Sequence, residues 1–199
     1  MRTLLFVADG PLDEAILPPI VATILKCRVI SEFWAWKNIR LHRGRGYERK
    51  LSYLLRSASS RELDGIVAII DADKDKRRNR VKSLRDGRKK ARSGGLNLPA
   101  AVGQAVPHGE AWLIADADAV KAGLRLAADH KIPSPAATPD PKSVLTDLYR
   151  ESPLSAERRA DVWADIARRV EPARCRHKKE TGYGAFQRDL NAEFRSSET

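Results

Sequence analysis

The sequence has few of the residues that mark disulfide-rich, zinc-binding or membrane proteins. It contains only two cysteines in 199 residues, Cys27 and Cys175, which lie far apart and form no C-x-x-C pair. A disulfide framework or a zinc site is therefore not expected. No apolar run approaches the roughly 20 residues of a membrane span, and the N-terminus lacks the basic, apolar and small-residue order of a signal peptide. We expect a cytoplasmic protein that does not enter a membrane.

Two common motifs for phosphate and calcium are also missing. The chain has no G-x-x-x-x-G-K-[ST] loop, which excludes a P-loop nucleotide site. Asp71, Asp73 and Asp75 have the spacing of the first three side-chain ligands of an EF-hand. Lys76 and Lys82 stand where that loop requires a glycine and a bidentate glutamate. The acidic residues therefore need another explanation.

The clearest strand in the sequence ends in these acidic residues. Residues 66–70, Ile-Val-Ala-Ile-Ile, form a short β-branched run that is typical of a strand buried on both faces. Asp71 and Asp73 follow it, and residues two apart in an extended chain point the same way. Both carboxylates can then face one hard cation at the sheet edge, where ligands bind in open α/β sheets. A solvated acidic turn is the simpler alternative.

The formal net charge is +11 and the sequence pI about 9.9, which favours a polyanionic partner. Residues 74–92 hold 11 Lys or Arg against two Asp, a net +9 directly after the acidic pair. Beside a metal ion this charge would hold a phosphate backbone, whereas alone it is equally typical of a solvated basic helix. The candidate nucleic-acid-binding residues are Lys74, Lys76, Arg77, Arg78, Arg80, Lys82, Arg85, Arg88, Lys89 and Lys90.

The other elements alternate between strand and helix, which predicts an α/β fold with a small parallel sheet flanked by helices. Strands are expected at 3–8, 66–70 and 101–106, and residues 28–41 are expected to hold a further strand and its flanks. Helices are expected at 11–24, 47–57, 142–150, 156–170 and 183–194. Pro18-Pro19 is expected to kink or restart the first helix. We predict an α/β domain over residues 1–130 and a helical C-terminal extension over 131–199, packed on it.

A further acid follows the strand at 101–106. Glu110 begins the helix in Gly-Glu-Ala-Trp-Leu-Ile-Ala-Asp, where it either offsets the helix dipole or serves as a metal ligand or general base. Asp116 lies six residues on, about 120° around a helix, so the two are not expected to share one ion. Cys175 and His177 lack further ligands nearby, which argues against a metal there.

Two of these segments resemble the Toprim domain of topoisomerases, primases and overcoming-lysogenization-defect nucleases. Asp9-Gly10 stands where that domain has a Glu-Gly turn after its first strand, and Asp71-Ala72-Asp73 matches its Asp-x-Asp. Asp9-Gly10-Pro11-Leu12-Asp13-Glu14 looks like the E-G-P-x-D-E opening of nuclease-type members. The Glu110 stretch looks like the signature of a bacterial Toprim-related family, domain of unknown function 4276.

The resemblance implies a Toprim-like, Rossmann-like sheet and a magnesium site. Asp9, Asp71, Asp73 and Glu110 are the expected metal-binding and catalytic residues, with Mg²⁺ or Mn²⁺ as cofactor. Asp9 is one methylene shorter than the usual glutamate, which could hold its carboxylate back from the ion. The role of that glutamate then falls either to Asp9 itself or to Glu14 or Glu110. The implied function is a metal-dependent nuclease acting on DNA or RNA, with an ATPase or other bacterial defence protein as a further partner.

Two alternatives stay open. The first is a Toprim-fold module that binds nucleic acid or a partner without catalysis, which the aspartate at position 9 favours. The second, ranked lower, is a nucleotide-sugar transferase whose D-x-D binds a divalent ion. The chain is short for that fold and shows no sugar-nucleotide pocket in its sequence.

Overall fold

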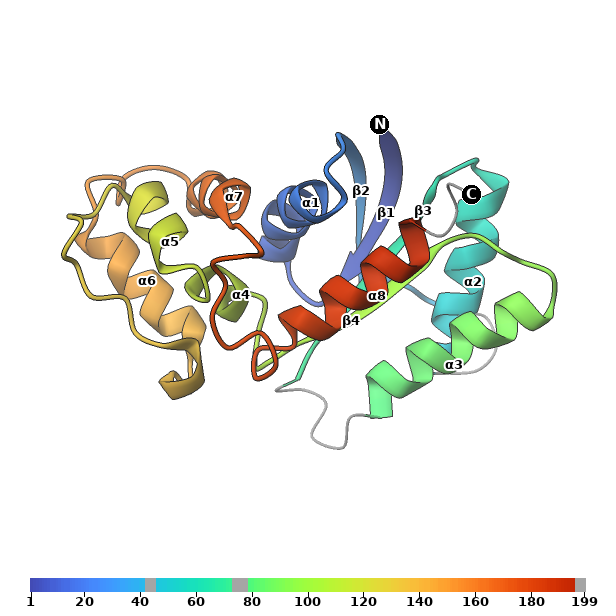
Figure 1. Ribbon diagram of the computed structural model, residues 1–199. Coiled ribbons are helices and arrows are strands. Elements are labelled where there is room, and N and C mark those ends of the chain that lie inside the picture. The colour runs from blue at the N-terminus through green and yellow to red at the C-terminus, as the bar shows by residue number, and fades with distance from the viewer. Residues whose placement is uncertain (42–45, 73–78, 196–199) are drawn as a thin grey trace.

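The structure, a computed structural model, describes residues 1–41, 46–72 and 79–195. Its centre is a sheet of four parallel strands in the order β2-β1-β3-β4 (Figure 1). The strands are β1 (Arg2–Ala8), β2 (Val29–Ala35), β3 (Gly65–Asp71) and β4 (Ala100–Ala105). The predicted α/β class with a small parallel sheet flanked by helices is confirmed.

The strand order creates one crevice at the carboxyl edge of the sheet. The chain passes from β1 to β2 on one side and then returns to β3 on the other side of β1. The order therefore reverses at β1, and the connections that leave β1 and β3 run to opposite faces of the sheet. In open α/β sheets ligands bind outside the carboxyl ends of the strands at such a reversal. The topology thus points to the ends of β1 and β3.

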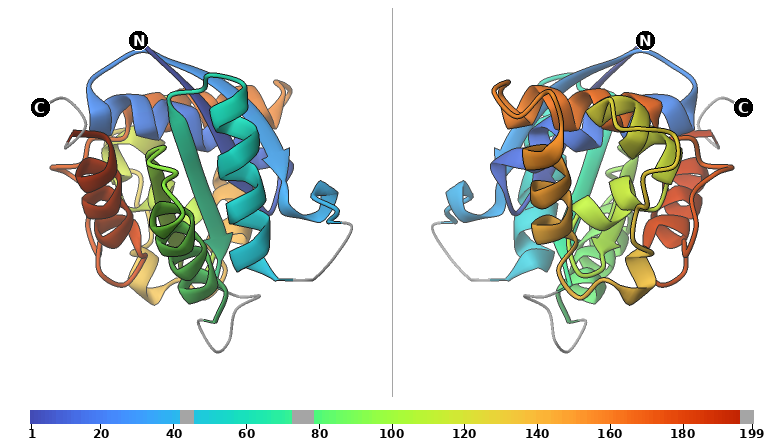
Figure 2. Two further views of the ribbon diagram at one scale, coloured as in Figure 1. Left: turned by 90° about the vertical axis from the view of Figure 1, so that its right-hand side faces the viewer. Right: turned by 90° about the vertical axis from the view of Figure 1, so that its left-hand side faces the viewer.

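Helices cover both faces of the sheet, and alternate strand residues face each layer. Leu4, Phe6 and Ala8 of β1 pack with α1 (Pro11–Leu25) and α8 (Tyr183–Arg195). Leu5 and Val7 pack on the opposite face with α2 (Tyr47–Ser60) and α3 (Asn79–Ser93). Figure 2 shows α8, α3 and α2 along one side of the molecule. β1, β3 and β4 are therefore buried on both faces over most of their length, as continuous apolar runs predict, whereas the edge strand β2 is mostly half-buried or exposed.

The first helix departs from expectation at its two prolines. α1 runs without interruption through Pro18 and Pro19, so the predicted restart is wrong. The residues Ile16, Leu17, Ile20, Val21 and Ile24 are buried, and α1 packs closely along a later helix, α7 (Arg159–Arg169). The free energy gained by burying this apolar side outweighs the unfavourable helix propensity of the two prolines.

The remaining helices form a lobe beside α1 (Figure 1 and the right-hand view of Figure 2). They are α4 (Glu110–Ile114), α5 (Ala117–Leu124), α6 (Pro141–Glu151) and α7, with a short 3-10 turn at Pro135–Ala137. Another 3-10 turn, Trp36–Asn38, follows β2 and packs on the α2 side of the sheet. Val162, Trp163, Ile166 and Ala167 of α7 are buried, as their spacing predicts. The predicted division at residue 130 stays a prediction, although α8 returns from this lobe to pack on β4.

Side chains of α8 cover the exposed edge of the sheet at β4. The backbone N–H of Val102 donates to Asp189 Oδ2 at 2.7 Å, and that of Ala100 donates to Glu193 Oε2 at 3.1 Å. Arg88 of α3 binds both carboxylates, with Nη1 2.7 Å from Asp189 Oδ2 and 3.1 Å from Glu193 Oε1. An edge that would otherwise offer free N–H groups to another chain is thereby satisfied within the molecule.

Candidate metal site and nucleic-acid interface

The structure brings Asp9 and Asp71 together at the reversal point of the sheet. Asp9 directly follows β1, and Asp71 is the last residue of β3. The backbone N–H of Asp71 donates to Asp9 Oδ2 at 3.1 Å. The shorter aspartate at position 9 therefore reaches the end of the neighbouring strand, with its second oxygen not used in this bond.

A third carboxylate, Asp13, lies among these residues and was not predicted as a site residue from the sequence. Its Oδ2 accepts the Gly10 N–H at 2.9 Å, which caps the start of α1. The same side chain is only 7% exposed. Burial raises the pKa of Asp13 to about 7, and the negative charges of Asp71, Glu110 and Asp9 act in the same direction.

Glu110 and His108 complete the cluster from the turn after β4. Glu110 is the first residue of α4 and is buried. The Asp13 carboxylate lies against Gly109, where a Cβ atom would be 3.0 Å from Oδ1. His108 Nδ1 lies 3.6 Å from Asp71 Oδ2, an ion pair when the imidazole is protonated. Four acidic side chains from β1, α1, β3 and α4 thus share one region.

A lysine borders this acidic cluster on the α2 side. Lys50 Nζ donates to the backbone oxygen of Trp36 at 2.7 Å and lies near the ring of Tyr47. Partial burial lowers the pKa of Lys50, while the charge of Asp9 opposes that shift. Arg80 of α3 lies over the same ring, with its guanidinium carbon 5.2 Å from the Tyr47 ring centroid. The site therefore joins a carboxylate cluster to a cationic, aromatic margin.

The donors suit a hard divalent cation, but their present arrangement is open. Carboxylate oxygens are the ligands that Mg²⁺ and Mn²⁺ prefer. Within residues 1–41, 46–72 and 79–195, no three Asp, Glu, His or Cys side chains are already grouped closely enough to hold an ion. Asp73, the second acid of the predicted pair, lies outside the described residues. The carboxylate ligands of the cluster fit such a metal ion. To surround one ion, the cluster would need Asp73 as a further ligand or a movement of the four acids towards one another.

Other acidic and sulfur-containing candidates have structural roles. Asp116 is 1% exposed, caps α5 through the Ala119 N–H and binds Arg174 at 3.1 Å. Glu14 is exposed on α1 and does not join the acids around Asp13. Cys175 is buried, and that burial raises the pKa of its thiol to about 11, which disfavours the thiolate that a metal would need.

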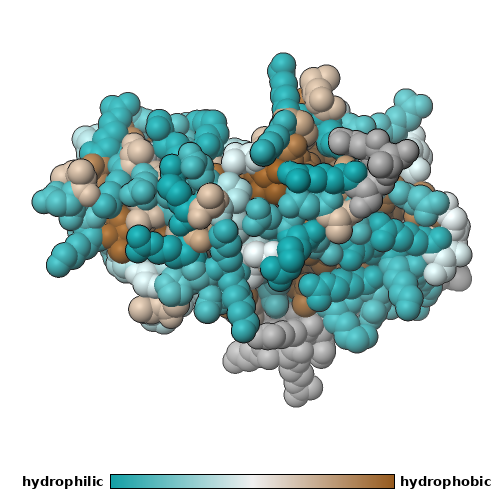
Figure 3. Space-filling model, in the orientation of Figure 1, coloured by the Kyte–Doolittle hydropathy of each residue, from teal (hydrophilic) through white to brown (hydrophobic). Residues whose placement is uncertain are grey.

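The predicted nucleic-acid-binding residues divide into three groups. Lys82, Arg85, Lys89 and Lys90 are exposed on α3, and Arg80 is half-buried. Figure 3 shows that hydrophilic side chains cover most of the face that carries α3 and α8. Arg88 faces inward, where it binds Asp189, so it is not available as a surface cation. Lys74, Lys76, Arg77 and Arg78 lie outside the described residues.

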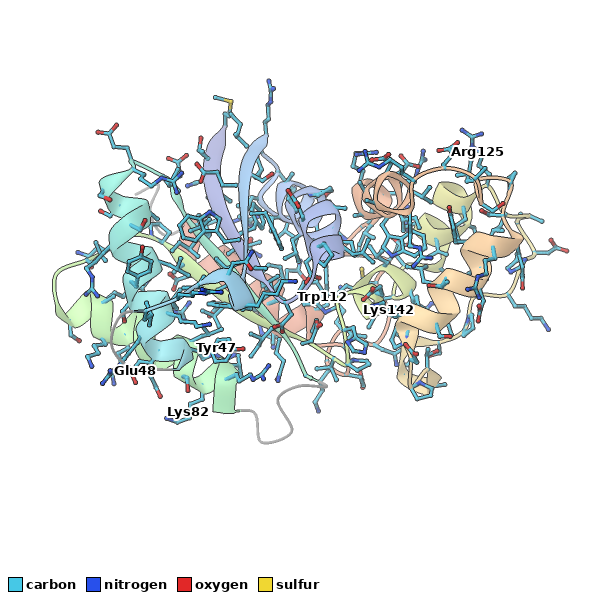
Figure 4. The ribbon with its side chains drawn as sticks, turned by 180° about the vertical axis from the view of Figure 1, so that it is seen from behind. Tyr47, Glu48, Lys82, Trp112, Arg125 and Lys142 are labelled. Atoms are coloured by element: carbon cyan, nitrogen blue, oxygen red, sulfur yellow. The ribbon has the colours of Figure 1, made fainter. Side chains whose placement is uncertain are left out.

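Trp112 accounts for part of the Gly-Glu-Ala-Trp stretch by packing alone. Its indole Nε1 donates to the Thr181 oxygen at 2.7 Å, and its ring stacks on Phe186 with centroids 5.0 Å apart. Figure 4 labels Trp112 between the α2–α3 side and the helical lobe. This residue anchors α8, and Glu110 is the member of the stretch that lies at the acidic cluster.

These features define a small Rossmann-like α/β protein with acidic side chains at its topological switch point. Comparison with known proteins adds no relative, since no family of sequences, no curated protein and no solved structure matches the chain. In the described part of the chain no helix is both long and apolar enough to span a membrane.

Proposed function

We propose that this protein is a Mg²⁺- or Mn²⁺-dependent nuclease that cleaves phosphodiester bonds in DNA or RNA. The observation that carries the proposal is the convergence of Asp9, Asp13, Asp71 and Glu110 at the sheet reversal. Burial raises the pKa of Asp13 most, and the neighbouring negative charges of Asp71, Glu110 and Asp9 raise it further, so these acids repel one another. A divalent cation would relieve that repulsion, and the Toprim resemblance leads to the same metal.

In this proposal some residues of the chain hold the metal ion and others bind the nucleic-acid substrate. Asp9, Asp71 and Glu110, with Asp73, would hold the ion, which when bound polarises the phosphoryl group and activates water. Asp13 would fix the start of α1 beside them through its bond to the Gly10 N–H. Lys50 would offer a positive charge to a phosphate entering beside Asp9. The exposed cations of α3, together with the predicted contacts at 74–78, would bind the flanking backbone.

Cleavage assays on matched variants test this proposal. Purified protein is incubated with labelled single-stranded DNA, duplex DNA and RNA in Mg²⁺, Mn²⁺ or EDTA. We expect metal-dependent cleavage that falls at least 100-fold in Asp71→Asn and in Asp73→Ala. Glu14→Gln is the control, since this exposed acid lies on the same helical turn as Asp13. Absence of cleavage under every condition, or equal cleavage by Asp71→Asn, would overturn the proposal.

A non-catalytic nucleic-acid-binding module is the second candidate, and the hydrogen bonds of the cluster favour it. Asp9 and Asp13 each accept a backbone N–H, which is a structural role for both carboxylates. This candidate predicts salt-dependent binding that an Asp9→Asn/Asp71→Asn variant retains, with no uptake of Mg²⁺ by the parent in calorimetric titration. An ATPase or other defence-system partner stays a prediction from the resemblance.

A further inference from the structure

A second surface feature lies outside the acidic cluster, between α2 and α3. The two helices enclose a hollow of about 750 Å³ that continues along residues 94–96 and is bordered by Arg40 and Leu41. Its cationic side chains are Arg40, Arg49, Arg56 and Lys90, against a single carboxylate, Glu48. Of these four residues, only Lys90 was predicted from the sequence as a nucleic-acid contact. The hollow thus carries a net positive charge.

Within the described residues, the arginines of this hollow form no ion pairs with carboxylates. Glu48 Oε1 lies 3.1 Å from Lys90 Nζ, so the one acid is paired with one of the cations. Arg40, Arg49 and Arg56 have no carboxylate partner in the part of the chain that the structure describes. Arg40, Arg49 and Arg56 are all exposed. Their charge is therefore available to an anionic ligand.

An aromatic ring stands between two of these arginines on one helix face. Arg49, Tyr53 and Arg56 have i, i+4, i+7 spacing, which aligns them along α2. The two arginines are two helical turns apart, roughly 10 Å at 1.5 Å per residue. Tyr53 is 42% exposed and makes no ring contact within the described residues. A large exposed aromatic flanked by guanidinium groups is the arrangement that stacks a base and holds the phosphates on either side of it.

We infer that this hollow binds single-stranded nucleic acid, with a base stacked on Tyr53 and the backbone held by Arg49 and Arg56. Only an unpaired base can place its ring face on Tyr53, since a duplex keeps its bases stacked inside. Leu41 and Leu96 supply an apolar border for the base. The inference names the substrate form of the proposed nuclease, and in that respect it rests on the proposed function.

The hollow and the acidic cluster are connected through α2. Lys50, beside Asp9, immediately follows Arg49 of the hollow. Figure 4 shows Tyr47 and Glu48 at the start of α2, on the same side of the molecule as Lys82 of α3. A strand bound along α2 would therefore lead towards the carboxyl ends of β1 and β3.

Binding is measured by fluorescence anisotropy of labelled oligo-dT and oligo-U, and of a DNA duplex, in EDTA so that no cleavage occurs. We expect Tyr53→Ala to weaken single-strand binding about tenfold, and Tyr53→Phe to stay within twofold because it keeps the ring. Arg49→Ala/Arg56→Ala should reduce the slope of log K against log salt by about 1.4. Duplex binding should be insensitive to Tyr53→Ala. The oligo-dT and oligo-U arms distinguish DNA from RNA as the natural strand.

Lys131→Ala/Lys142→Ala is the control with the same charge change. Both lysines are exposed, and Figure 4 places Lys142 with Arg125 on the helical lobe. The inference fails if Tyr53→Ala binds single strands as the parent does, or if the control pair weakens binding as much as the arginine pair. It also fails if a poly-glutamate peptide binds with the same affinity and the same dependence on Tyr53.

The outcome is separable from that of the proposed catalysis. Tyr53-dependent binding in EDTA supports the hollow as a single-strand site even if no metal-dependent cleavage is found. Cleavage by the parent protein together with unchanged binding and cleavage by Tyr53→Ala overturns the hollow alone.

Discussion

Asp13 shows how a single residue links the fold to the chemistry of the site. Its carboxylate caps α1 through the Gly10 N–H and lies against Gly109 at the start of α4. Capping alone would favour the ionised form. Burial and the three neighbouring acids act in the opposite direction and are stronger, because the pKa rises to about 7. The folded protein therefore holds this group protonated over a pH range in which the unfolded chain would not.

This difference predicts a specific pH dependence of stability without metal. The pKa of Asp13 rises from 3.8 in its ordinary state to about 7 on folding, so its contribution is fully present below about pH 4 and is lost as the pH rises through 7. Asp13→Asn keeps an acceptor for the Gly10 N–H but does not titrate. In EDTA the variant should gain stability relative to the parent between pH 5 and 8, by up to roughly 4 kcal/mol.

Urea unfolding of the parent and of Asp13→Asn across this pH range measures the difference. Glu14→Gln is the control and should show no such trend. Mg²⁺ added at pH 8 should stabilise the parent more than Asp13→Asn, if the ion is held by the ionised cluster. A free-energy difference that does not change with pH would show that the Asp13 carboxylate is not coupled to its neighbours as the structure indicates.

At the scale of elements, α3 carries arginines with two different roles, one in stabilising the fold and one at the surface, and its sequence does not tell them apart. Its basic residues all looked equally suited to a phosphate backbone, yet Arg88 is turned towards α8 and Arg85 towards solvent. Arg88 is 14% exposed in its side chain and neutralises the carboxylates that cap the β4 edge. One arginine of the helix therefore maintains the fold, and its neighbour three residues away is free for a ligand.

Substitution of these two arginines should separate stability from binding. Arg88→Ala leaves the partly buried Asp189 without its cation, while Glu193 keeps Arg92, and it should lower the free energy of unfolding by about 2–4 kcal/mol. Arg85→Ala should change it by less than about 0.5 kcal/mol. Arg85→Ala should instead reduce the salt dependence of oligonucleotide binding, by about 0.7 in slope for a single strand. Urea titration and anisotropy measure the two effects, and the opposite assignment would show that Arg88 is a surface contact.

The crossing of α2 and α3 depends on a glycine. A Cβ atom at Gly87 would lie 2.5 Å from the backbone oxygen of Glu48, and backbone cannot yield as a flexible side chain can. Ser52 Oγ also donates to the Gly87 oxygen at 3.3 Å. This close approach sets the distance between α2 and α3, the two helices that border the hollow around Tyr53.

Gly87→Ala should therefore destabilise the protein by about 1–3 kcal/mol, despite the better helix propensity of alanine. Gly94→Ala is the matched control, because its Cβ atom would meet only the Ala91 and Lys90 oxygens, at 3.4 and 3.6 Å. Thermal unfolding followed by circular dichroism compares the two. A Gly87→Ala variant as stable as Gly94→Ala would mean that the helices separate without cost.

Sequence patterns predicted the elements well and their tertiary roles less completely. The strands were evident because continuous β-branched runs such as 66–70 are typical of parallel sheets buried on both faces. Asp71 and Glu110 were predicted as site candidates because polar residues that follow parallel strands meet at one edge, and Asp9 was predicted through the Toprim resemblance. Asp13 was named only within the Asp9–Glu14 motif and was not predicted as a site residue, since its burial depends on Gly109, about 100 residues away. A glycine followed three residues later by an acid at a helix start was the available signal.

At the scale of the whole molecule, the last helix is part of the sheet's own core. α8 comes from the segment predicted as a C-terminal extension, yet Tyr183, Phe186, Leu190 and Phe194 are fully buried in the cluster that includes Leu4 and Phe6. Phe186 also stacks on Trp112, just after the acidic cluster. The same helix caps the β4 edge. We therefore expect α8 and the sheet that carries the acidic cluster to fold together in one cooperative transition.

Removal of α8 should consequently unfold the protein rather than trim it. Each of the four buried side chains contributes about 1.5–3 kcal/mol, together roughly 6–12 kcal/mol, which is comparable to the whole stability of a typical domain. A chain ending at residue 182 should lose its cooperative urea transition. Phe186→Ala should cost about 3–5 kcal/mol, whereas Arg188→Ala, exposed on the same helix, should be near neutral. A cooperative transition in the shortened chain would instead establish α8 as a dispensable cover, and the sheet with its acidic cluster as an independent folding unit.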